Sequence, residues 1–166
     1  MYRKVTIDIL QELAQDAMEI ASKYSRPHKT EFFFDPIIFA LLQERGFGRV
    51  TRQYPLPRLP SQQRASRIDY YVGGYTPVLI ELACRAQGAE LMAGANASEL
   101  KKLIRKRKAR TRFLLLIDPT KHPPHKEEKL KARYDAWKPG KGNFLRLPVR
   151  VIYVRPDKAY HFMWKR

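Results

Sequence analysis

Hydrophobic and polar positions alternate with different periods along the chain, and the period predicts the elements. In residues 5–24, apolar residues recur at helical spacing while acidic residues occupy the opposite face, which predicts an amphipathic helix. A second helical stretch covers residues 30–45 and ends before Gly46. Apolar runs at 67–72 and 78–85 flank a short turn that contains Gly and Pro, which predicts a β-hairpin.

The remaining elements complete an α/β pattern. A continuous apolar run at 113–117 predicts a strand that is buried on both faces. The other elements are a strand around 50–54, helices at about 97–111 and 127–137, and closing strands at 149–154 and 159–164. The order α-α-β-β-β-α-β-α-β-β predicts an α/β domain with a central mixed sheet, and no linker divides residues 1–166.

The start of the second helix has two interpretations. Thr30 could cap a helix that carries Glu31 in its first turn and that Pro36 kinks. Alternatively, Asp35 is the cap and Pro36 takes the first helical position, where proline is tolerated. In the second case Glu31 lies just ahead of the helix.

The hairpin places two acidic residues opposite each other. If Val72 pairs with Val78 across the five-residue loop, Asp69 faces Glu81 on the same side of the sheet. Directly opposite residues have Cβ atoms roughly 5 Å apart, so like charges there repel each other. A divalent metal ion or neighbouring arginines would explain the pair.

The charge of the chain points to a polyanionic partner. The 33 Lys and Arg residues against 16 Asp and Glu residues give a formal net charge of +17. Nucleic acid is the first candidate, DNA in preference to RNA, and an anionic membrane surface is the second. The residues expected to contact phosphates lie in an extended basic loop and on the helix at 97–111; they are Arg58, Arg64, Lys101, Lys102, Arg105, Lys106, Lys108 and Arg110.

Cysteine and histidine usage excludes two other classes. Cys84 is the single cysteine, so an internal disulfide is impossible, and the scattered histidines do not give the ligand spacing of a zinc cluster. The sequence shows neither the hydrophobic region of a signal peptide nor an apolar run of membrane-spanning length. We therefore expect a cytoplasmic protein with no membrane partner.

The arrangement of acids resembles that of the PD-(D/E)XK nuclease superfamily. In that family a hairpin supplies an Asp and a (D/E)-X-K tripeptide, often with a Glu on the preceding helix; Asp69, Glu81 and Glu31 match these positions. The resemblance implies a restriction-endonuclease-like αβββαβ core over roughly residues 30–117, elaborated by the helix at 5–24 and by residues 118–166. It also implies a DNA endonuclease in which Asp69 and Glu81 hold Mg²⁺, with Mn²⁺ as a substitute, and in which subunits could pair as a homodimer.

One position departs from the family pattern. The tripeptide is Glu81-Leu82-Ala83, so Ala83 stands where the family places lysine. Four residues could supply the missing positive charge: Arg67, which the register places beside Ala83, Arg85 on the same face, and Lys101 or Lys102 one helix later. An arginine could not act as a general base, because guanidinium does not deprotonate in proteins.

Other functions remain open from the sequence. Without the lysine, the chain could be a nucleic-acid-binding protein on the same fold that has lost catalysis. It could also be a basic assembly factor for a nucleoprotein complex. The simplest alternative is a surface cluster in which Arg67 and Arg85 pair with the two carboxylates.

Overall fold

The order of elements in the computed structural model confirms the sequence prediction. The structure describes residues 3–24, 31–56, 66–85, 94, 96–105, 109–142 and 144–165. The elements are α1 (Ile7–Ser22), α2 (Glu31–Glu44), β1 (Val50–Pro55), β2 (Arg67–Val72), β3 (Val78–Cys84), α3 (Ala97–Leu103), β4 (Thr111–Ile117), α4 (Glu127–Ala136), β5 (Val149–Val154) and β6 (Ala159–Trp164).

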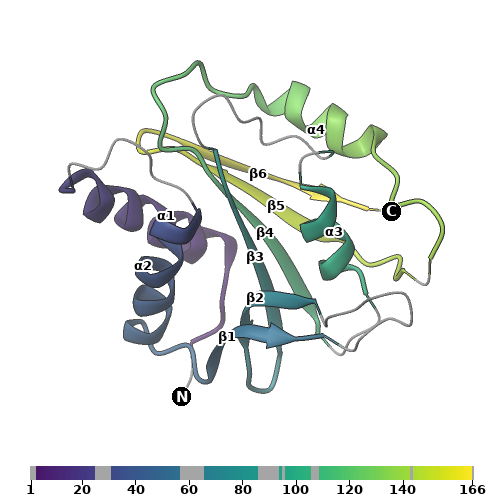
Figure 1. Cartoon of the computed structure of the whole chain (residues 1–166), viewed down its shortest axis with the longest axis horizontal. Coiled ribbons are helices and arrows are strands. Elements are labelled where there is room, and N and C mark those ends of the chain that lie inside the picture. Colours follow the sequence, from purple (N-terminus) through teal and green to yellow (C-terminus); the bar gives the residue numbers. More distant parts are fainter. Residues whose placement is uncertain are drawn as a thin grey trace.

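The strands form one mixed sheet in chain order, β1-β2-β3-β4-β5-β6. β1 to β3 are antiparallel, β4 and β5 continue parallel to β3, and β6 is antiparallel to β5. The helices cover the two faces of the sheet, with α1 and α2 on one side and α3 and α4 on the other (Figure 1). Over the residues described, the protein is therefore an α/β structure with a six-stranded mixed sheet flanked by four helices.

Alternation along the strands divides the core into two halves. On β3, Ile80 and Leu82 pack toward α1 and α2, whereas Leu79 and Ala83 pack toward α3 and α4. Glu81 lies between Leu79 and Ala83, so its side chain belongs to the face covered by α3. β4 is buried along almost its whole length, as its continuous apolar run predicts.

Two helix boundaries bear on the predictions. The start of α2 decides between its two interpretations, and the end of α3 corrects its predicted length. α2 begins at Glu31 and contains Pro36, so Glu31 is in the first turn of the helix, as in the first of the two interpretations. The proposed cap, Thr30, is outside the described residues. α3 ends at Leu103 rather than near residue 111, because Arg105 leaves the helix to form a bridge with Phe144. Within the described part of the chain, no helix has the length and apolar character needed to cross a bilayer.

Candidate active site

The hairpin brings Asp69 and Glu81 next to each other, as predicted, one residue beyond the last pair of its ladder. Val72 pairs with Val78, and the ladder continues to Tyr70 and Ile80. The ladder ends there, and beyond it the two carboxylates accept hydrogen bonds from backbone N–H groups. The Leu82 N–H donates to Oδ2 of Asp69 (2.8 Å), and the Asp69 N–H donates to Oε1 of Glu81 (3.0 Å). Each acid is thus fixed by the backbone of the opposite strand.

The end of the ladder corrects the expectation for Arg67. The predicted pairing of Arg67 with Ala83 lies beyond Tyr70 and Ile80, the last residue pair of this hairpin. On the other side of β2, Arg67 pairs with Pro55 of β1, and the residue is exposed. Its backbone carbonyl, rather than its guanidinium, takes part in the site, because that oxygen accepts a hydrogen bond from Lys102 (3.1 Å).

Lys102 brings an ammonium group to the two carboxylates. Its Nζ lies 2.5 Å from Oε2 of Glu81, and Glu81 is fully buried. The neighbouring Lys101 is exposed, since successive residues of α3 point in different directions. Of the four cations that the sequence offered, the structure therefore places Lys102 in the site.

Burial controls the protonation of this cluster. Burial raises the pKa of Glu81 well above its ordinary value, and the nearby Asp69 charge adds to the effect. Burial also raises the pKa of Asp69, although the Leu82 N–H opposes the shift. Burial alone would lower the pKa of Lys102, but the attraction of Glu81 outweighs it and the pKa is raised. Lys102 therefore carries its positive charge at neutral pH.

Glu31, in the first turn of α2, is the third acid of the site, which we call the acidic cluster together with Asp69 and Glu81. Much of the residue is exposed, yet desolvation of its carboxyl group and the charge of Asp69 raise its pKa to about 7. The same turn is held to the sheet by Asp35, whose Oδ1 accepts a hydrogen bond from the Tyr70 hydroxyl (2.6 Å) and whose Oδ2 pairs with Arg52. Asp35 thus fixes the end of α2 that carries Glu31.

Glu31→Gln is expected to stabilise the metal-free protein at pH 8 and to change its stability little near pH 4. The pKa of Glu31 is about 7 in the folded protein against an ordinary value of 4.5, so between these pH values the folded state holds a proton that the unfolded state has lost. Stability then falls as pH rises, and the neutral glutamine removes this penalty. Urea denaturation in EDTA at the two pH values measures the difference.

Glu19→Gln is the matched control, since it removes one carboxylate from an exposed position on α1. Its stability should follow that of the wild type at both pH values. An unchanged stability of Glu31→Gln at pH 8 would contradict the raised pKa.

Sequence reasoning missed Gln53, which contacts Asp69 from β1. Its side-chain amide donates to Oδ1 of Asp69 (3.2 Å). Arg52 pairs with Tyr70 and Tyr54 with Ile68, so Gln53 lies opposite Asp69, and its φ of 53° is left-handed. Such a conformation costs energy in a residue other than glycine and is frequent at functional sites. No local pattern in residues 50–55 distinguishes Gln53 in advance.

Arg85 serves a different cluster. Its Nη1 donates to Oδ2 of Asp118 (3.1 Å) and to the carbonyl of Pro123 (3.0 Å). Arg155 and Tyr153 also donate to the fully buried Asp118, from β5 and the residue that follows it. This engagement leaves Arg85 poorly placed to replace the lysine of the tripeptide, which corrects the expectation from the sequence.

The residues expected to contact phosphates are only partly described. Lys101 and Arg110 are exposed, whereas Arg105 is half-buried beside its bridge to Phe144. Arg58, Arg64, Lys106 and Lys108 are outside the described residues. Within the described ranges, no group of three or more His, Cys, Asp or Glu side chains is arranged to hold a metal ion.

The comparisons with known proteins assign no family. No protein-family model matches the sequence, and the search of curated proteins finds no match. A solved structure, "Crystal structure of SSO0001", aligns over 100% of this chain and 69% of its own at 10% identity, with a TM-score of 0.31. A likeness at that score supports no conclusion about fold or function.

Proposed function

We propose that this protein is a metal-dependent endonuclease that hydrolyses phosphodiester bonds of DNA, on a restriction-endonuclease-like core. The observation that carries the proposal is the pair of opposed carboxylates, Asp69 and Glu81, at the point where the hairpin ladder ends, with the Lys102 ammonium 2.5 Å from Glu81. Two acids and a lysine are the groups that the PD-(D/E)XK pattern assembles. Here the lysine comes from α3 instead of the tripeptide.

The order and direction of the strands support the same core. The elements α2, β1, β2, β3, α3 and β4 follow one another as αβββαβ. β1 to β3 are antiparallel, and β4 adds parallel to β3 after the α3 crossover. The acids lie on β2 and β3 and at the start of α2, which are the positions that the family pattern expects.

The metal in this proposal is magnesium. Mg²⁺ is commonly bound by one or two carboxylates, with water and substrate phosphate completing its coordination. Asp69 and Glu81 would hold it, and Oε2 of Glu81 would exchange its contact with Lys102 for the metal. The chemistry that Mg²⁺ supplies when bound is activation of a water molecule and stabilisation of the negative charge that develops on a phosphate.

The surrounding residues have separate tasks in this proposal. The Leu82 N–H and the Gln53 amide fix the two oxygens of Asp69. Lys102 remains protonated and places a positive charge beside the phosphate. Glu31, whose pKa is about 7, can accept a proton near neutral pH.

The test is cleavage of plasmid and single-stranded DNA with Mg²⁺, with Mn²⁺ and with EDTA. Cleavage should require the metal and should fall by more than about a hundredfold in both Asp69→Ala and Glu81→Ala, because each loses a proposed metal ligand. Glu19→Ala, an exposed acid of α1, is the control and should cut like the wild type. Cleavage that persists in both variants would refute the proposed site.

A second function is favoured by the ion pair itself. In this structure the Lys102 ammonium contacts the Glu81 oxygen that the metal would need, and Ala83 leaves the tripeptide incomplete. A nucleic-acid-binding protein on the same fold that has lost catalysis would show both features. DNA binding that weakens steeply with salt, with no cleavage under either metal, would support this alternative.

A further inference from the structure

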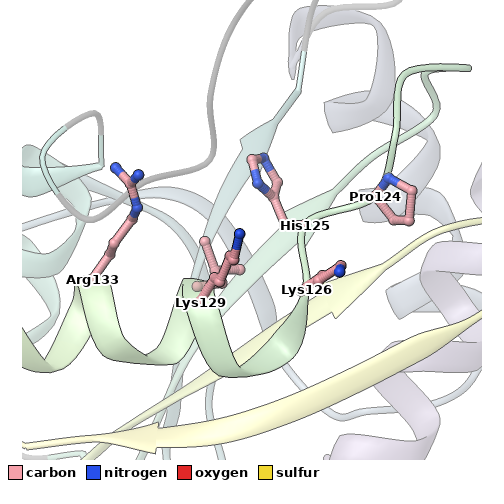
Figure 2. A pocket seen from close by; sticks show the side chains of 6 residues that line it. Pro124, His125, Lys126, Lys129 and Arg133 are labelled. Atoms are coloured by element: carbon pink, nitrogen blue, oxygen red, sulfur yellow. The ribbon is translucent and has the colours of Figure 1, made fainter.

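A cavity beside α4 is lined by basic residues and lies apart from the acidic cluster. Its volume is about 200 Å³, and its lining residues are Pro124, His125, Lys126, Lys129, Leu130 and Arg133. Figure 2 shows His125, Lys129 and Arg133 extending to the same side of α4. None of the lining residues is acidic, so the cavity is suited to an anion.

Helical spacing gathers the positive charges of α4 on this side. At 3.6 residues per turn, Lys129 and Arg133 share one face of α4 beside the buried Leu130, and Lys126 lines the cavity from the N-cap position just before the helix. Two acids of α4, Glu128 and Asp135, lie on the opposite side of the helix. The basic side chains that line the cavity are thereby kept away from Glu128 and Asp135.

The three cations have no competing partner among the residues that the structure describes. Within the described part of the chain, no ion pair or side-chain hydrogen bond involves Lys126, Lys129 or Arg133. By contrast, Lys131 on the other face of α4 pairs with Asp135 (3.0 Å). A bound anion would therefore replace water around these groups rather than an internal carboxylate.

The wall formed by His125 is held in place by two tyrosines. The His125 N–H donates to the hydroxyl of Tyr153 (3.2 Å), and the Tyr160 hydroxyl donates to the His125 carbonyl (2.8 Å). The imidazole also packs edge-on against Tyr153, with ring centroids 5.8 Å apart. The tyrosines of β5 and β6 thus fix His125 at one side of the cavity, while Lys126, Lys129 and Arg133 line it as exposed side chains.

We propose that this cavity binds a phosphate group of a nucleic-acid strand, as a second contact outside the acidic cluster. The Arg133 guanidinium offers a planar donor fork and the lysines offer point charges, which together suit a phosphate. The net charge of +17 already favours a polyanion over a single small anion. The proposal rests on nucleic acid as the partner, and it does not require cleavage.

The cavity and the candidate active site lie on the same face of the sheet. α3 and α4 pack into one half of the core, and the Asn96 amide of the α3 cap donates to the Tyr134 hydroxyl of α4 (3.2 Å). Lys102 reaches Glu81 from α3, while Lys126, Lys129 and Arg133 line the cavity from α4. The helices that carry these two groups of cations therefore lie on the same face of the sheet.

The experiment compares DNA affinity as a function of salt in EDTA, so that no cleavage occurs. The test variant is Lys126→Gln/Lys129→Gln/Arg133→Gln, and fluorescence anisotropy of labelled single-stranded and duplex DNA gives the affinity. The control is Lys23→Gln/Lys141→Gln/Arg146→Gln, which removes the same three charges from exposed positions elsewhere. Thermal denaturation checks that both variants fold, and Arg133→Gln alone serves if the triple variant does not.

The test variant should bind DNA about tenfold more weakly near 0.1 M salt. The plot of log K against log salt has a negative slope, which should become shallower by about 0.7–0.9 for each phosphate that the protein no longer neutralises. The control should keep the wild-type slope. Equal losses of affinity in both variants would overturn the proposal, because they would reflect net charge alone. Binding of inorganic phosphate that needs these residues, with unchanged DNA binding, would also overturn it and would assign the cavity to a free anion.

Failure of this proposal is distinguishable from failure of the proposed function. Asp69→Ala should lose cleavage and keep the wild-type salt slope. The triple variant should lose part of the slope and, at saturating DNA, should keep the metal-dependent chemistry.

Discussion

Lys102→Met is expected to lower the free energy of unfolding by about 3–5 kcal/mol at neutral pH. Glu81 is fully buried, and the Lys102 ammonium 2.5 Å away is its ion-pair partner. Removing one member of a buried pair leaves the other charge in a poorly solvated environment, which costs about this much. Urea denaturation at pH 7 in EDTA measures the loss.

The neighbouring lysine provides a matched control. Lys101→Met removes the same charge from an exposed position one residue away and should change stability by no more than about 0.5 kcal/mol. Adding Glu81→Gln to Lys102→Met should recover much of the loss, because the unpaired charge is then gone. Equal stability of Lys102→Met and the wild type would show that the ion pair does not stabilise the fold.

Asp118→Ala is expected to destabilise the protein by a comparable amount, about 3–5 kcal/mol. Asp118 is fully buried and accepts hydrogen bonds from Thr120 Oγ1 (2.6 Å), Tyr153 (2.5 Å), Arg85 (3.1 Å) and Arg155 (3.3 Å). Its loss would remove the carboxylate that the buried guanidinium of Arg85 contacts and would break the hydrogen bonds of this buried cluster. Denaturant unfolding at pH 7 measures the effect.

The pH dependence of this contribution has a defined sign. Burial favours the neutral acid, but the hydrogen bonds from Thr120, Tyr153 and Arg85 outweigh it and lower the pKa of Asp118 below its ordinary 3.8. Its stabilisation is therefore present above that value and is lost as the pH falls through the lowered pKa. Asp157→Ala is the control, because Asp157 is 72% exposed and its ion pair with Arg155 should contribute less than about 1 kcal/mol. An Asp118→Ala variant no less stable than this control would refute the role of the cluster.

Local sequence patterns are sufficient for the elements and for the hairpin. The alternation in residues 67–72 and 78–85 and the short turn between them determine the register. Continued by one residue past the Tyr70–Ile80 pair, this register brings Asp69 and Glu81 together. The sequence allows two starts for α2, since Pro36 is compatible with either, and the start at Glu31 is one of them. These features depend on neighbours within one hairpin or one helix.

Long-range packing determines the rest of the site. Whether Lys101 or Lys102 meets Glu81 depends on how α3 is rotated against the sheet, which Leu100 and Leu103 set by packing into the core. Arg85 turns to Asp118 because the parallel register aligns Cys84 with Ile117, so that the residues following β3 and β4 become neighbours. No pattern within either segment reveals the other.

The left-handed backbone at Gln53 is likewise a tertiary feature. A strand pattern predicts extended backbone at every position of β1, and glutamine has no intrinsic preference for a φ of 53°. The contact of its amide with Asp69 depends on the pairing of β1 with β2. A residue placed in this way could be found only from the assembled sheet.

The most direct test of the proposed metal site is the anomalous diffraction of a crystal soaked in Mn²⁺. We expect a peak between Asp69 and Glu81, accompanied by movement of the Lys102 ammonium away from Oε2 of Glu81. A crystal saturated with Mn²⁺ that shows no peak there, and in which Lys102 still contacts Glu81, would contradict the assignment of these carboxylates as metal ligands.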